Sequence, residues 1–129
     1  MDKKQKYLIP VAILLLLFII AISGAKPMIE KNLKNLESLT LENIDLSSIE
    51  DGIYEGKYKV FPIAAEANVI VKDHKITEIE LVKHDNGKGA AAEVITDMVI
   101  EKQTLEIDVI TGATYSSKVI LKAIENALK

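Results

Sequence analysis

The sequence predicts an α+β protein, in which a small antiparallel sheet is packed with helices and is preceded by a single N-terminal transmembrane helix. Three observations predict this class. Residues 7–25 form a stretch of 19 residues without a charged side chain. Short runs with β-type alternation begin at residue 51, and segments with helical spacing of apolar residues follow them. Strands followed by helices are typical of an α+β domain, and 129 residues leave room for one small domain.

The composition excludes several kinds of functional site. The chain has no cysteine and only two histidines. Disulfide scaffolds, thiolate zinc sites, iron–sulfur clusters and thiol nucleophiles are therefore excluded. The sequence also lacks a GxxxxGK[ST] phosphate loop, an HExxH motif and a GxSxG motif. We therefore predict neither a metal site nor a set of hydrolytic catalytic residues.

The uncharged stretch, YLIPVAILLLLFIIAISGA, is long enough as a helix to cross a hydrocarbon core. Lys3, Lys4 and Lys6 precede it, and positive charge beside a first membrane helix favours the cytoplasmic side. We therefore expect residues 1–25 to form a cytoplasmic tip and a transmembrane anchor in the cell membrane, with the C-terminal domain extracytoplasmic. The alternative is a signal peptide that is cleaved near the small residues 23–25. Both interpretations place the domain in the same compartment.

The rest of the chain, residues 26–129, is acidic. It contains 13 lysines and 18 acidic residues, which gives a net charge of −5. Proteins that bind the phosphate backbone of nucleic acids need a clustered basic face. We therefore expect no nucleic-acid partner.

We expect residues 26–50 to form an amphipathic spacer between the membrane and the domain. Leucines and isoleucines recur among acids and amides from Leu33 to Ile49. The first half has helical spacing, whereas the second half, from Thr40 onward, is irregular and is expected to be a connector. The expected role of the spacer is to lift the domain off the membrane and to cover part of its core.

Residues 51–129 are predicted to form the folded domain, which begins with a meander of about three antiparallel strands. The first strand is expected over residues 54–61, and alternation in residues 67–72 and 77–81 predicts the next two. Asp73 and His74 lie between these two runs. Both residue types tolerate the left-handed backbone of a two-residue hairpin, so we predict a tight turn there.

The rest of the domain is predicted to be a helix, a short strand and a second helix. The first helix spans residues 91–101, and its expected core-facing residues are Ala91, Val94, Ile95 and Met98. The strand is expected over residues 105–109. The last helix spans residues 116–129, and its apolar face consists of Ile120, Ala123, Ile124, Ala127 and Leu128.

The segment DVITGATYSS, residues 108–117, leads into the last helix and crowds hydroxyl side chains at its start. Two interpretations of this segment are open. Ser and Thr are preferred helix N-caps, because the side-chain oxygen accepts a hydrogen bond from an unpaired backbone N–H. Alternatively, the free N–H groups and the positive end of the helix dipole form a site for an anion, such as a phosphate held beside a hydroxyl.

This segment resembles the flavinylation motif of the FMN-binding domain family, which includes the covalent-flavin subunits of sodium-pumping NADH:quinone oxidoreductase and of the Rnf electron-transport complex. The positions that match the motif are Asp108, Thr111, Gly112, Ala113, the acceptor Thr114, Ser116 and Ser117. Three upstream segments are similar to further motifs of the family, in the same order. They are DGIYEGKYK at residues 51–59, VKDHKITEIEL at residues 71–81 and KHDNGKG at residues 83–89.

The resemblance implies an FMN attached by a phosphoester between its phosphate and the Thr114 hydroxyl, installed from FAD by a separate flavin transferase. Asp108 would belong to the pattern that the transferase reads, and the small Gly112 and Ala113 would let it approach the backbone. The protein would then be an electron-transfer flavoprotein rather than a turnover enzyme. It would carry electrons from a membrane redox donor, such as a quinone-linked dehydrogenase, to an acceptor outside the cytoplasm.

Further residues could complete the flavin site. His84 and Lys88, in a glycine-rich loop, could reach the phosphate or the isoalloxazine, and the alternative for them is a solvated turn. Tyr115 could stack on the flavin or pack as a half-buried aromatic residue. Two other functions stay open: a flavin-free binding or assembly module of a membrane complex, and non-covalent FMN binding in a cell without a flavin transferase.

Overall fold

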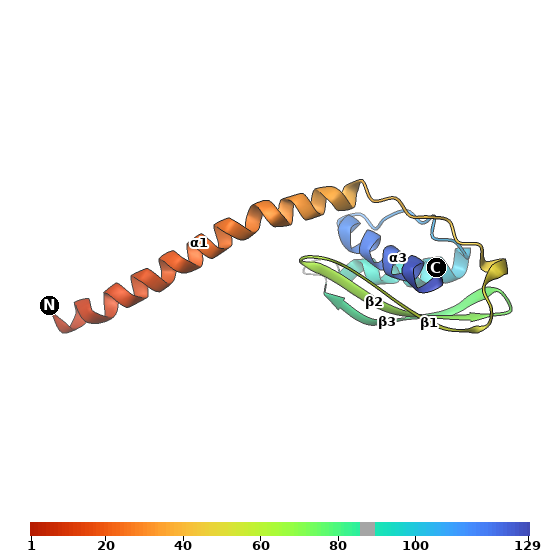
Figure 1. The fold of residues 1–129 in the computed structure, drawn as a ribbon, viewed down its shortest axis with the longest axis horizontal. Helices are drawn as coiled ribbons and strands as arrows, with labels where there is room; N and C mark the ends of the chain where they lie inside the picture. Colours follow the sequence, from red (N-terminus) through yellow and green to blue (C-terminus); the bar gives the residue numbers. More distant parts are fainter. Residues whose placement is uncertain (86–89) are drawn as a thin grey trace. The chain divides into compact units, whose positions relative to one another are not determined.

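Residues 1–85 and 90–129 are described in the structure, a computed structural model, and the chain divides into two compact units, Met1–Asn32 and Leu33–Lys129. The first unit is the N-terminal part of helix α1 (Lys3–Glu37), drawn in red and orange in Figure 1. Its apolar side chains are exposed to solvent. Among the described residues, α1 is the helix that is long and apolar enough to cross a membrane, a property that signal sequences share.

The sheet is a meander of three antiparallel strands in the order β1-β2-β3, as the sequence predicts. The strands are β1 (Gly52–Val60), β2 (Ile63–Lys72) and β3 (Lys75–Asp85) (Figure 1). Asp73 and His74 form the predicted turn between β2 and β3, and their φ values of 51° and 59° are left-handed. The Asp51 carboxylate accepts the backbone N–H of Asp73 at 2.7 Å, which fixes this turn against the start of β1.

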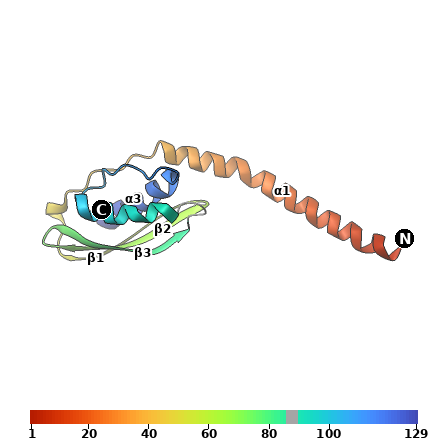
Figure 2. The ribbon, with the colours of Figure 1, turned by 180° about the vertical axis from the view of Figure 1, so that it is seen from behind.

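Helices cover one face of the sheet. The short helix η1 (Leu46–Ser48) precedes β1, and η2 (Ala90–Val94), α2 (Ile95–Lys102) and α3 (Thr114–Leu128) follow β3. Helix α3 contacts β1 and β2, and α2 contacts β3. Figures 1 and 2 show these helices on the same side of the strands. Alternate residues of β2 are buried against them: Ala65, Ala67, Val69 and Val71.

Helix α3 approaches β1 closely at Gly56. A Cβ atom at this position would overlap the carbonyl oxygen of Ala123 and the backbone nitrogen of Ala127. Only glycine therefore fits there. The side chain of Asn126 donates to the carbonyl of Lys57 at 2.9 Å, so a hydrogen bond holds the same contact.

The segment before the sheet takes part in the core. Leu36, in the last turn of α1, is only 1% exposed. Apolar side chains between Leu33 and Ile49 pack against the same core. The helix ends at Glu37 and the chain then runs irregularly apart from η1, which confirms the predicted helix and connector. The division into a spacer over residues 26–50 and a domain over residues 51–129 stays a prediction.

The predicted strand over residues 105–109 does not form. Leu105 and Ile107 are buried, as an alternating strand would have them, but the segment has no strand partner among the described residues. The backbone N–H of Ile107 instead donates to the carbonyl of Leu105 at 2.8 Å. The alternation of apolar and polar residues therefore predicted which side chains are buried. It did not predict the backbone hydrogen bonds, because a strand forms them only with a neighbouring strand.

The predicted core-facing side of the helix after β3 is also partly wrong. The first turn is the 3₁₀ helix η2, and the α-helix begins only at Ile95. Ala91 and Val94 are exposed, whereas the buried apolar residues are Ala92, Ile95 and Val99. A 3₁₀ turn has fewer residues than an α-turn, so it shifts the phase of the residues before the α-helix. The apolar face predicted for α3 is confirmed.

Candidate functional site

A tight turn sets the position of Thr114. The backbone N–H of Ala113 donates to the carbonyl of Ile110 at 2.9 Å, and Gly112 has a left-handed φ of 81°. This geometry fits a type II turn, in which glycine is favoured at the third position. The turn ends at Ala113, the N-cap residue, so Thr114 is the first residue of α3.

The buried side chain of Ser117 stabilises this turn through two hydrogen bonds. Its hydroxyl donates to the carbonyl of Ala113 at 2.7 Å and accepts the backbone N–H of Ile110 at 3.1 Å. The side chain is fully buried. Ser117 therefore stabilises the backbone on which Thr114 is held.

The first turn of α3 keeps unpaired donors. No side chain caps the helix, so the interpretation of the hydroxyls as N-caps is wrong. The first intrahelical bond runs from the N–H of Ser117 to the carbonyl of Ala113. The N–H groups of Thr114, Tyr115 and Ser116 therefore have no intrahelical acceptor, and none is found among the described residues. These donors and the helix dipole favour an anion beside the Thr114 hydroxyl.

The predicted motif residues differ in exposure. Asp108, Thr111 and Gly112 are exposed, and Thr114 is half-buried. In contrast, Ala113 is 6% exposed and Ser116 is 2% exposed. The Ser116 hydroxyl is buried without a hydrogen-bond partner in the part of the chain that the structure describes. A macromolecule that approaches Thr114 can therefore contact Asp108, Thr111 and Gly112, while Ser116 faces inward.

Tyr115 and Lys118 connect the first turns of α3 to the end of α1. The Tyr115 hydroxyl donates to Glu37 Oε1 at 2.9 Å, and Lys118 Nζ donates to the carbonyl oxygen of Glu37 at 2.6 Å. The hydrogen bond to Glu37, with burial and the charge of that carboxylate, raises the pKa of Tyr115 above its ordinary value of 10.0. Sequence reasoning missed Glu37 and Lys118, because residues about 80 positions apart give no local signal. The stacking of Tyr115 on a flavin stays a prediction.

His84 lies in a different environment from the loop that the sequence suggested. It belongs to β3, and its side chain is only 2% exposed. Its Nδ1 lies 3.1 Å from Glu93 Oε1, in η2, the helix that also contacts α3. Lys88, the other predicted contributor from this segment, lies outside the described residues.

The segment that contains this site matches a known family. The sequence profile described as FMN-binding domain covers residues 62–129. This chain belongs to the FMN-binding domain family. The match includes β2, β3 and all later elements, whereas β1 lies before it. We conclude that the protein is an FMN-binding flavoprotein.

One curated relative carries a similar segment. Over 63 residues the chain is 35% identical to the urocanate reductase of Eggerthella lenta, a match that covers 46% of this chain and 10% of the reductase. The chain therefore spans about a tenth of the length of this relative. No solved structure matches the chain.

The residues at the start of α3 fit an FMN phosphate. A half-buried hydroxyl at Thr114 is adjacent to three backbone N–H groups that lack acceptors in the described part of the chain. Among the described residues, the one carboxylate hydrogen-bonded to that first turn is Glu37, whose contact is with the Tyr115 hydroxyl. Neutral and dipolar donors around a hydroxyl are suited to holding a phosphoester monoanion.

Proposed function

We propose that this protein is a membrane-anchored, extracytoplasmic electron carrier, with FMN linked covalently through a phosphoester to Thr114. Electrons would pass from a membrane redox donor, such as a quinone-linked dehydrogenase, to an acceptor outside. The observation that carries the proposal is the place of Thr114. It is the first residue of α3, beside three unpaired N–H groups, in the segment DVITGAT of an FMN-binding domain.

Attachment requires an exchange of phosphate bonds. The Thr114 oxygen would form a new P–O bond with the FMN phosphorus of FAD, and the P–O–P bond to the adenylate would break. AMP leaves, and the hydroxyl proton passes to a base of the flavin transferase. No oxidant or reductant is needed. The exposed Asp108, Thr111 and Gly112 offer the transferase a surface next to the acceptor hydroxyl.

After attachment, the chain's own residues would hold the phosphoester. The N–H groups of Thr114, Tyr115 and Ser116 would donate to its oxygens, and Ser117 would keep the turn in place. The bound flavin supplies the redox chemistry. The similarity to a segment of a urocanate reductase supports a redox role for this domain.

The membrane location rests on α1. Its uncharged stretch, residues 7–25, is long enough to span a bilayer, and Lys3, Lys4 and Lys6 favour a cytoplasmic N-terminus. A covalent bond would then have a physical advantage, because a flavin that dissociated outside the cell would be lost by dilution.

Intact-mass measurement tests the linkage. The chain is produced with and without an extracytoplasmic flavin transferase, and the denatured protein is also examined for in-gel flavin fluorescence. We expect a mass gain of one FMN less one water only with the transferase, and no gain in Thr114→Ala. Thr77→Ala, which removes an exposed hydroxyl from β3, outside the motif, is the matched control and should still be labelled.

Other outcomes would identify another function. Flavin that co-purifies with the native protein but is lost on denaturation would indicate non-covalent FMN binding instead of a covalent linkage. A chain without flavin under all conditions would favour a binding or assembly module of a membrane complex.

A further inference from the structure

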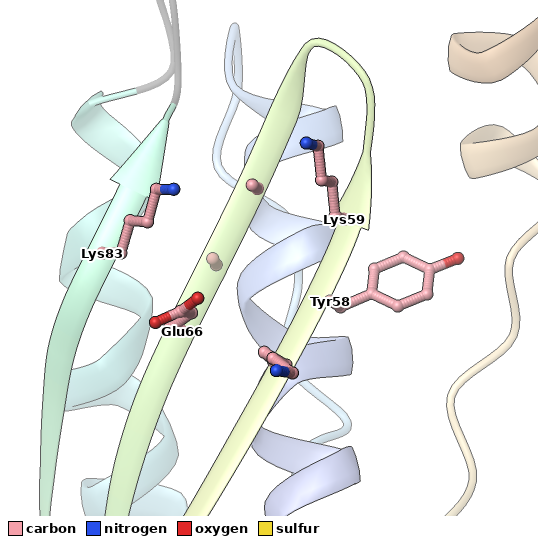
Figure 3. A pocket seen from close by; sticks show the side chains of 7 residues that line it. Tyr58, Lys59, Glu66 and Lys83 are labelled. Carbon is pink, nitrogen blue, oxygen red and sulfur yellow. The ribbon is translucent and has the colours of Figure 1, made fainter.

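The open face of the sheet, opposite the helices, carries a hollow of about 400 Å³ (Figure 3). It is lined by Lys57, Tyr58, Lys59, Ala64, Ala65, Glu66 and Lys83. Figure 3 shows Lys59 on β1 and Lys83 on β3, on either side of β2, with Glu66 between them and Tyr58 turned away. None of these residues belongs to the site at Thr114.

The strand register explains why a hollow forms here. Lys57, Glu66 and Lys83 lie opposite one another on the three strands. The next row on the same face consists of Lys59, Ala64 and Asp85. Ala64 is the one short side chain among these six, so long charged side chains surround a methyl group. The hollow is therefore a consequence of alanine at position 64.

The lysines around this hollow are incompletely neutralised. Lys83 lies 3.5 Å from Asp85, and both side chains are more than half exposed. Among the described residues, Lys57 and Lys59 have no carboxylate within 4.0 Å. The hollow thus concentrates positive charge in a part of the chain, residues 26–129, whose net charge is −5. Such a local excess attracts anions of complementary shape.

The floor and the rim of the hollow favour different parts of a ligand. Ala64, which is 7% exposed, the backbone of β2 and the aliphatic stems of the lysines form a mainly apolar floor. The rim carries ammonium groups that can donate to an anion, and the carboxylate of Glu66 can only accept. Small-molecule pockets commonly combine an apolar lining with a few polar groups, and their volumes are roughly 300–1,000 Å³.

We propose that this hollow binds a small planar organic carboxylate. The carboxylate would accept hydrogen bonds from Lys59 and Lys83, the ring would lie over Ala64, and a hydroxyl or N–H group of the ligand would donate to Glu66. A phosphate ion or another compact anion would lack the ring that fills the floor. This inference does not rest on the flavin linkage and concerns a separate face of the domain.

Backbone amide shifts in an NMR titration test the proposal. The full-length chain, in an uncharged detergent and at physiological ionic strength, is titrated with 4-hydroxybenzoate. We expect saturable shifts at residues 57, 59, 64 and 83. The neutral analogue 4-hydroxybenzamide has nearly the same shape, and it should bind about tenfold more weakly because it loses the charge-assisted contacts.

Two variants separate charge from shape. Lys59→Gln removes one ammonium group and Ala64→Leu fills the hollow with all charges kept, and each should weaken binding about tenfold. Lys72→Gln, which removes an exposed lysine from the other end of β2, is the matched control and should have no effect. Unchanged amide shifts elsewhere would show that each variant is folded.

Three results would overturn the proposal. The first is shifts that do not saturate. The second is equal weakening by Lys59→Gln and Lys72→Gln, which would indicate general attraction to the surface. The third is binding of inorganic phosphate as tight as that of 4-hydroxybenzoate and unaffected by Ala64→Leu, which would mean that the hollow recognises charge alone.

Discussion

Glu125 is a carboxylate with no exposed surface, in the middle of an apolar helix face. It accepts the backbone N–H of Glu42 at 3.0 Å, and its Oε1 lies 2.8 Å from Lys122 Nζ and 3.0 Å from Lys129 Nζ. Burial alone raises its pKa, but the hydrogen bonds from Lys122, Lys129 and Glu42 outweigh burial. The pKa of Glu125 is therefore lowered from its ordinary value of 4.5.

We expect Glu125→Gln to reduce the free energy of unfolding at neutral pH by about 2 kcal/mol, because two ammonium groups lose their charged acceptor. The ionised carboxylate stabilises the fold, so this difference should be complete above the unfolded pKa. It should shrink as pH falls through the lower folded pKa. Urea titrations between pH 2 and 7 measure the difference. Glu106→Gln, at an exposed position, is the control, and a pH-independent loss would contradict the ionic explanation.

Tyr115 provides a spectroscopic test of the contact between α3 and the end of α1. The Glu37 carboxylate accepts a hydrogen bond from the Tyr115 hydroxyl. We therefore expect Glu37→Gln to lower the pKa of Tyr115 toward 10.0. NMR titration of the ring, assigned with Tyr115→Phe, measures this shift. Glu50→Gln removes an acidic side chain that has no contact with Tyr115 and should leave the titration unchanged. An unshifted Tyr115 in Glu37→Gln would show that the two residues do not interact in solution.

At the scale of single residues, the sequence predicts the residues of the motif better than the side chains that contact them. The positions of Gly112 and Thr114 at a turn before a helix could be predicted, because turn and helix preferences are local. Asp108 was expected in a strand, which does not form. The partners Glu37 and Lys118 could not be predicted, since they depend on how distant segments pack. The assignment of His84 to a loop was wrong because β3 continues to Asp85, beyond the alternating residues 77–81 from which the strand was predicted.

Among the elements, α3 packs on β1 with its closest approach at Gly56. We expect Gly56→Ala to reduce the free energy of unfolding by about 3 kcal/mol, because the added methyl group meets backbone atoms that cannot move independently. Gly52→Ala in the same strand is the matched control, since its Cβ would lie at least 3.5 Å from other atoms. Thermal unfolding by circular dichroism compares the two. Equal melting temperatures would mean that α3 is farther from β1 than described.

The elements also show where periodicity succeeds as a guide to structure. The meander and α3 were predicted because each has a regular pattern over many residues. Residues 105–109 alternate as a strand would, but hydrogen bonding of a strand depends on a partner elsewhere in the chain. The phase of the helix after β3 depended on a 3₁₀ turn, which amino-acid spacing does not reveal.

At the scale of the whole molecule, buried apolar residues begin only at Leu36. We therefore expect residues 33–129 to fold as a soluble fragment with nearly the stability of the full chain, while the full chain sediments with membranes. Leu36→Ala in the fragment should cost about 2–5 kcal/mol, the usual loss for a buried leucine. Fractionation and thermal unfolding measure both effects. A fragment that starts at residue 51 and melts at the same temperature would show that residues 33–50 do not contribute.

The absence of cysteine allows a direct test of membrane topology. We expect Glu106→Cys to react with a membrane-impermeant maleimide in intact cells, and Lys3→Cys to react only after the cells are opened. The chain without cysteine is the unlabelled control. Labelling of Lys3→Cys in intact cells would contradict the proposed orientation and would indicate an extracytoplasmic N-terminus.

The order of the elements along the chain has a consequence for biosynthesis. The three strands leave the ribosome before α3, although α3 covers the apolar face of β1 and β2. A sheet with one apolar face must bury that face against another element to be stable. The domain therefore completes folding only after residues 114–128 have emerged, and Thr114 reaches its position at the start of α3 only then. Flavin attachment at Thr114, as proposed, would consequently have to follow the synthesis of α3.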